Sequence, residues 1–165
     1  MMNQEKNDLS GMFNEHDNQA IVREVRYTVL MISHGFAFGL FDSAFQDVER
    51  LFHGKYEGYR PCNTPYHDFS HTLMVLLAMT RMMHGASLQG IRFSEKEINL
   101  GLISALMHDT GYIQSADDFV GTGAKYTMVH ISRSIRFVQN YYAGHSYFAG
   151  ETKNFHDVLS CTGIH

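Results

Sequence analysis

Residues 106–112 of the chain read LMHDTGY and place a His-Asp pair at the end of an apolar stretch. Upstream, Ser94 and Glu97 match the S-x-x-E pattern of a helix capping box, and apolar residues follow at helical spacing along one face. Gly111 is positioned to end such a helix. The sequence therefore predicts a buried helix that starts after Ser94 and carries the His-Asp pair on its last turn.

The rest of the chain also shows helical rather than strand periodicity. It contains only two prolines and few alternating polar and apolar runs, which argues against a sizeable sheet. The sequence Asn-Thr-Pro at residues 63–65 offers an N-terminal cap and a first-turn proline for a second helix, which Gly85 should end. The predicted fold class is all-α, a helical bundle with further helices at 21–32, 41–52, 128–142 and from residue 155 onward.

The length of the chain predicts one domain. A sequence of 165 residues with 44% hydrophobic content is long enough for one substantial core. We expect residues 1–15, which are polar, to be a flexible N-terminal tail, and residues 16–165 to form a single helical domain, either complete or truncated at its C-terminal end. The apolar stretch at 27–41 falls short of the roughly 20 residues that a membrane helix needs.

Charge and cysteine content limit the partners that the chain is expected to have. The net charge is −4 and no run of like charges is present, so the basic surface typical of nucleic-acid binding is lacking. Cys62 and Cys161 form no CxxC pattern, and no signal peptide is evident, which fits a reducing compartment. We therefore expect a cytoplasmic protein that acts on soluble small molecules, without a nucleic-acid or membrane partner.

Histidines and aspartates supply the candidates for chemistry. The His-Asp pair occurs four times where roughly 0.6 would be expected by chance, at 16–17, 67–68, 108–109 and 156–157. His67 and His71 are four residues apart, so on a helix their imidazoles would point the same way, toward one ligand or metal ion. An exposed pair of histidines, or histidines satisfied in the core, would show the same spacing. His108 and Asp109 diverge by about 100° on a helix and converge on one ion only where the helix ends or packs tightly against its partner.

At these residues the chain resembles the HD superfamily of metal-dependent phosphohydrolases, whose pattern is one His, then a His-Asp pair, then a distant Asp. His71 and the pair His108-Asp109 match the first two elements. Residues 65–79, PYHDFSHTLMVLLAM, also resemble the Y-H-N-x-x-H signature of class I 3′,5′-cyclic nucleotide phosphodiesterases, with Asp68 in place of the Asn of that family. The resemblance runs from residue 60 to residue 140, which is about half of the chain.

This resemblance implies an HD-domain bundle that binds one or two divalent metal ions, with Mg, Mn, Zn and Fe as the candidates. His71, His108, Asp109 and a later Asp would be ligands, and His130 would contact a second metal or a phosphate unless it is a structural histidine. His67 would be the general acid that protonates the leaving oxygen, while a metal-bound hydroxide attacks phosphorus. The implied substrate is a cyclic nucleotide, a nucleotide or a related phosphoester.

The chain departs from the superfamily pattern after Asp109. Asp117 and Asp118 follow too closely and are expected in a loop, whereas Asp157 comes earlier than the last Asp of the superfamily. Asp157, His165 or a residue beyond the end of the sequence would complete the site. Two alternative functions therefore remain open: a non-catalytic HD domain that binds a nucleotide or a partner, and an HD-type di-iron oxygenase that uses similar ligands to hold redox iron.

Overall fold

The computed structural model describes residues 18–148 and 150–161, and in this part of the chain the regular elements are all helical. The predicted all-α fold class is therefore confirmed. The expected tail at 1–15, the pair at 16–17 and His165 lie outside the described residues. The α-helices are Asn18–Ile32 (α1), Gly39–Phe52 (α2), Phe69–Leu88 (α3), Glu95–Met107 (α4), His130–Tyr141 (α5) and Thr152–Ser160 (α6). None of the helices described is long and apolar enough to cross a membrane.

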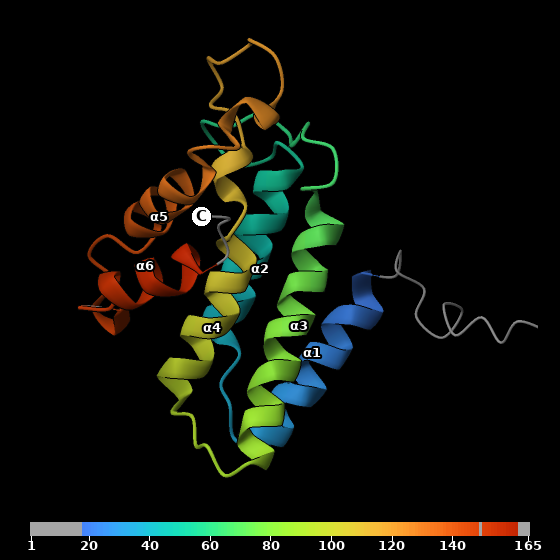
Figure 1. The fold of residues 1–165 in the computed structure, drawn as a ribbon, viewed down its shortest axis with the longest axis vertical. Helices are drawn as coiled ribbons and strands as arrows, with labels where there is room; N and C mark the ends of the chain where they lie inside the picture. The colour runs from blue at the N-terminus through green and yellow to red at the C-terminus, as the bar shows by residue number, and fades with distance from the viewer. Residues whose placement is uncertain (1–17, 149, 162–165) are drawn as a thin grey trace, which may run out of the picture.

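The first four helices form the body of the molecule, with α5 and α6 packed at one side (Figure 1). Helix α3 packs against both α1 and α4, and α4 also contacts α2 and α6. Helices α3 and α4 run in opposite directions, so the beginning of α3 and the end of α4 lie at the same end of the bundle (Figure 1). This topology brings the two sequence motifs together.

Helix α4 forms as its sequence predicts. The Ser94 hydroxyl accepts a hydrogen bond from the backbone N–H of Glu97, and the Glu97 carboxylate accepts one from the backbone N–H of Ser94, which completes the capping box. From residue 101 to residue 109 every residue is buried. Three short 3-10 turns follow along the chain, and the first of them, η2 (Thr110–Tyr112), begins directly after Asp109.

Helix α3 begins later than the sequence predicts. The expected cap at residues 63–65 is wrong, because Tyr66 has a φ of 73°, in the left-handed region, where a right-handed helix cannot continue. The cap is Asp68, whose carboxylate accepts a hydrogen bond of 2.9 Å from the backbone N–H of His71. The amide of Asn63 instead joins two distant segments, donating to Gln114 and accepting from the N–H of Gly123. The helix also continues through Gly85.

Gly111 serves close packing rather than helix termination. A Cβ at this position would lie 1.9 Å from the backbone oxygen of His130, so only glycine fits beneath the start of α5. The N–H of Gly111 donates to the Ser134 hydroxyl at 2.9 Å, and that hydroxyl donates to the carbonyl of His108 at 2.6 Å. Arg133 donates from Nε to the Gly111 carbonyl at 2.6 Å. Helix α5 therefore fixes the backbone on both sides of Asp109.

We expect Gly111→Ala to lower the free energy of unfolding by about 1–3 kcal/mol or more, because the added methyl group overlaps backbone that cannot move without shifting α5. Gly85→Ala is the matched control, since a Cβ at Gly85 meets nothing within 4 Å and lies inside α3. That variant should gain about 0.5–1 kcal/mol from helix propensity. Urea denaturation of both variants measures the two effects, and equal midpoints would show that the close approach does not constrain residue 111.

Candidate metal centre

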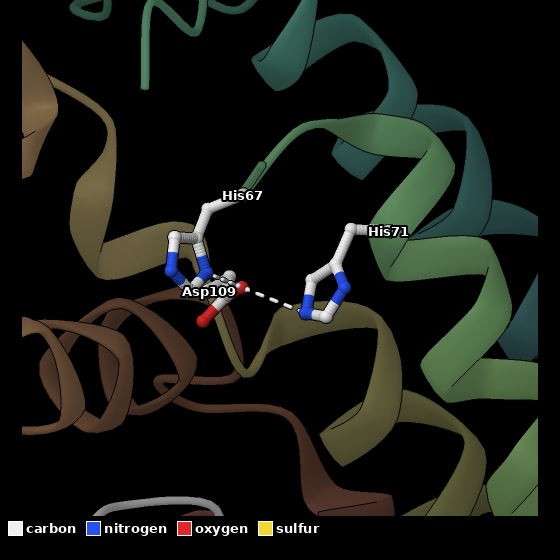
Figure 2. Close-up of side chains that lie close together, drawn as sticks. All are labelled: His67, His71 and Asp109. Atoms are coloured by element: carbon white, nitrogen blue, oxygen red, sulfur yellow. Dashed lines mark hydrogen bonds and ion pairs between the residues drawn. The ribbon is translucent and has the colours of Figure 1, made fainter. Parts of the chain in front are cut away.

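Three chain segments bring histidines to one aspartate at the shared end of α3 and α4. His67 lies in the loop just before the cap of α3, His71 lies in the first turn of α3, and His108 and Asp109 follow the last residue of α4. Figure 2 shows the rings of His67 and His71 on either side of the Asp109 carboxylate. The sequence placed His67 and His71 on one helix, and this is corrected here because His67 precedes the helix.

One oxygen of Asp109 is the point of convergence. Its Oδ2 atom lies 2.7 Å from Nδ1 of His67, 3.5 Å from Nε2 of His71 and 3.1 Å from Nε2 of His108. Ligand atoms of His67, His71 and Asp109 all lie within 4.8 Å of one another, which is close enough to surround a single ion. This group contains the predicted acid, His67, and two predicted ligands, His71 and Asp109, whereas His108 lies outside the group and contacts the same Asp109 oxygen.

The protonation states of the cluster suit ligand chemistry. Burial by itself would raise the pKa of Asp109, but hydrogen bonds and charge from His108 and His67 outweigh burial and lower the pKa to about 2. Burial also lowers the pKa of His71, although Asp109 opposes that change. At neutral pH the cluster therefore offers an ionised carboxylate and a neutral imidazole at His71, and metal ligands need these forms.

Two of the imidazoles are held by partners outside the cluster. Nδ1 of His108 lies 2.8 Å from the carbonyl oxygen of Ala105 and donates to it, so Nε2 is the nitrogen that faces Asp109. The ring of His67 stacks on Tyr112, with ring centroids 4.3 Å apart. Tyr112 is a contact that sequence reasoning missed, although it lies only three residues after Asp109. Its position beside the His-Asp pair was the available signal.

His130 lies next to this cluster rather than within it. Its ring also stacks on Tyr112, with ring centroids 4.4 Å apart. The centroid of the His130 ring is 6.5 Å from that of His67. Nδ1 of His130 lies 2.6 Å from the carbonyl of Thr127, which leaves Nε2 as the nitrogen able to bind a ligand. A role in binding a second metal or a phosphate therefore stays a prediction for His130.

Tyr66, the first residue of the signature that resembles the phosphodiesterases, lies on the exposed side of the cluster. Its side chain is 76% exposed, and its ring centroid is 4.9 Å from that of His71 and 5.4 Å from that of His67. Residues in the left-handed region other than glycine are uncommon and concentrate at functional sites. The unusual backbone of Tyr66 therefore directs a large ring beside the two histidines.

The structure does not bring the later aspartates to the cluster. Asp157 of α6 pairs with Lys153 and lines a hollow with Ser94 and Glu97, at the opposite end of α4. A helix of 13 residues is about 20 Å long, so Asp157 is far from Asp109. Asp118 is loop-bound, as expected, and its carboxylate accepts hydrogen bonds from Lys125 and Tyr126. Among the residues described, no aspartate other than Asp109 is part of the cluster.

No family model, no curated protein and no solved structure matches the chain. The described residues define an all-helical protein with a cluster of histidines around a buried aspartate. The chemistry of that cluster is therefore the basis for any functional proposal.

We expect the metal-free protein to lose stability as the pH falls from about 4 to about 2. The pKa of Asp109 is lowered on folding to about 2, so its ionisation contributes about 2 kcal/mol of stability above the unfolded pKa and loses it as the pH falls through the folded one. Asp109→Asn should remove this contribution at neutral pH. Urea denaturation of EDTA-treated protein between pH 2 and pH 7 measures the difference.

Asp117→Asn is the control, because that carboxylate is exposed and makes no hydrogen bond or ion pair with the described residues. Its stability profile should follow that of the wild type. A constant gap between Asp109→Asn and the wild type over the whole pH range would contradict the role given to the buried carboxylate.

Proposed function

We propose that the chain is an HD-type, metal-dependent phosphohydrolase that acts on a cyclic nucleotide, a nucleotide or a related phosphoester. The observation that supports it is the convergence of His67, His71 and His108 on one oxygen of Asp109. These are the residues at which the sequence resembles the HD superfamily and the phosphodiesterase signature. The HD-domain bundle is part of the same proposal.

The donor set fits a divalent transition metal. His71, His108 and Asp109 would hold the ion, and imidazole nitrogens suit Zn and Fe better than Mg, which prefers oxygen ligands and keeps several waters. A bound divalent ion supplies a Lewis acid that polarises a phosphoryl oxygen and lowers the pKa of a water molecule. The hydrogen bond from His108 Nδ1 to Ala105 fixes the ring so that Nε2 is presented toward this position.

His67 is proposed to be the general acid. The Asp109 carboxylate lies 2.7 Å from its Nδ1 atom and orients the ring, and the stacked Tyr112 supports the ring from one face. The side chain is 30% exposed, so a leaving oxygen can approach Nε2. The same distances would allow His67 to be a ligand of the ion, and the two roles give different results on mutation.

The non-catalytic alternative is supported by one observation. Among the residues described, no later aspartate reaches the cluster, so the pattern of the superfamily is incomplete there. A di-iron oxygenase is the other alternative, since the nitrogen-rich donor set also suits iron. Elemental analysis of protein purified without added metal distinguishes these classes: two iron atoms per chain indicate the oxygenase, one or two ions of Zn or Mn indicate hydrolysis, and no metal indicates the binding domain.

We expect EDTA to lower the melting temperature, because an ion that binds only the folded state stabilises it. His71→Ala should abolish this difference and the bound metal together. His84→Ala, also on α3 but close to its other end, should keep both. Thermal melting with and without chelator, combined with metal analysis, provides the measurement. Identical wild-type melting curves in both conditions would argue against a metal centre.

We expect His67→Ala to keep its metal but to lower kcat by about 10²- to 10⁴-fold for a phosphodiester with a poor leaving group. The loss should be much smaller for bis-p-nitrophenyl phosphate, because p-nitrophenolate needs little protonation. Steady-state kinetics with both substrates, beside metal analysis, test the role. Loss of the metal in this variant would make His67 a ligand, and equal slowing of both substrates would exclude it as the acid.

A further inference from the structure

A second polar site lies on the α5 side of the η2 turn, in a hollow of about 90 Å³. Its polar lining comes from Arg133, Arg136 and Asn140 of α5, Thr110 and Gly111 of η2, and Tyr59. The clustered histidines and Asp109 do not line it. The site therefore differs from the proposed metal centre, although η2 connects the two.

The charged residues that line the hollow are all positive. Two arginines line it, and no carboxylate is among its lining residues. The guanidinium of Arg133 is already fixed in place, since Nε donates to the Gly111 carbonyl, Nη2 donates to the Ile113 carbonyl at 2.9 Å, and its carbon lies 3.6 Å from the centroid of the Tyr126 ring. Its Nη1 group makes no hydrogen bond within the described part of the chain. A preorganised cationic donor of this kind favours an anion.

Three other polar side chains of the lining have no partner among the described residues, whereas the Thr110 hydroxyl donates to the Met107 carbonyl at 2.8 Å. The guanidinium of Arg136, the amide of Asn140 and the hydroxyl of Tyr59 make no hydrogen bond or ion pair with the residues that the structure describes. Arg136 lies three residues after Arg133, so both side chains leave the same face of α5. The hollow therefore collects several N–H and O–H donors that the fold itself does not use.

We propose that this hollow binds a tetrahedral oxyanion of phosphate size, either inorganic phosphate or the phosphoryl group of a small phosphoester. The hollow is small, at about 90 Å³, which suits a compact ion of this size. Arginine binds phosphate oxygens through paired, charge-assisted hydrogen bonds. The amide of Asn140 and the Tyr59 hydroxyl supply further donors.

The position of the anion would connect it to the histidine cluster. Thr110 and Gly111 belong to the turn that begins directly after Asp109, and the arginines belong to the helix that holds this turn. An anion between them would bridge α5 and η2 and stabilise the backbone that positions Asp109. The anion site uses none of the proposed metal ligands, so it does not rest on the proposed function.

Isothermal titration calorimetry with inorganic phosphate tests the site. The full chain should be treated with EDTA, and His71→Ala should bind phosphate as the wild type does, which excludes binding at the metal centre. We expect Arg136→Ala to weaken binding about tenfold or more, since one charge-assisted hydrogen bond is lost. Asn140→Ala should weaken binding less. Both variants should keep the melting temperature of the wild type, because these side chains make no hydrogen bond or ion pair with the residues that the structure describes.

Arg92→Ala is the matched control, since it removes one exposed positive charge near the other end of α4. It should leave the phosphate affinity unchanged. Equal weakening by Arg92→Ala and Arg136→Ala, or no effect of Arg136→Ala, would overturn the proposal in favour of nonspecific attraction. Glycerol 3-phosphate identifies the source of the anion: tighter binding than inorganic phosphate indicates a phosphoester, weaker binding indicates the free ion, and binding of neither ligand overturns the proposal.

Discussion

The arrangement of this end of the bundle depends on the burial of one carboxylate. Asp109 is only 2% exposed and stays ionised, and an unpaired charge in that position would cost several kcal/mol. Three imidazoles from separate segments meet its Oδ2 atom and offset that cost. The antiparallel course of α3 and α4, and the late start of α3, are the conditions under which these rings can reach it (Figure 1).

Local sequence patterns predicted the helices where local forces decide the outcome. The capping box at Ser94 and the apolar spacing after it were sufficient for α4, because all the groups involved lie within one helix. The start of α3 was mispredicted, since Asn63 and Pro65 form an equally good local cap. The amide of Asn63 instead bonds with Gln114, 51 residues later in the chain. A contact of that range leaves no local pattern, so the sequence alone did not reveal the competition.

The residues of the candidate site also fall into those that the sequence predicted and those that it did not. His71, His108 and Asp109 were found because the motifs carry them, and His67 was found with the wrong placement on a helix. Ser134 and Arg133 were missed, because their role is to bond the carbonyls on either side of Asp109 across more than 20 residues of chain. Asp157 had the right residue type for a ligand, but α6 places it by the first turn of α4. Residue type and spacing thus identified donors, whereas tertiary packing decided which of them meet.

The left-handed backbone of Tyr66 lowers the stability of the folded protein. An L-residue with a φ of 73° costs of order 1 kcal/mol or more relative to glycine, and the exposed ring repays little of that through burial. Selection for thermal stability alone would therefore favour glycine at position 66. Selection for the function proposed at His67 and His71 would favour the tyrosine ring that lies beside them. Position 66 is thus where resistance to heat and performance at the cluster are expected to oppose each other.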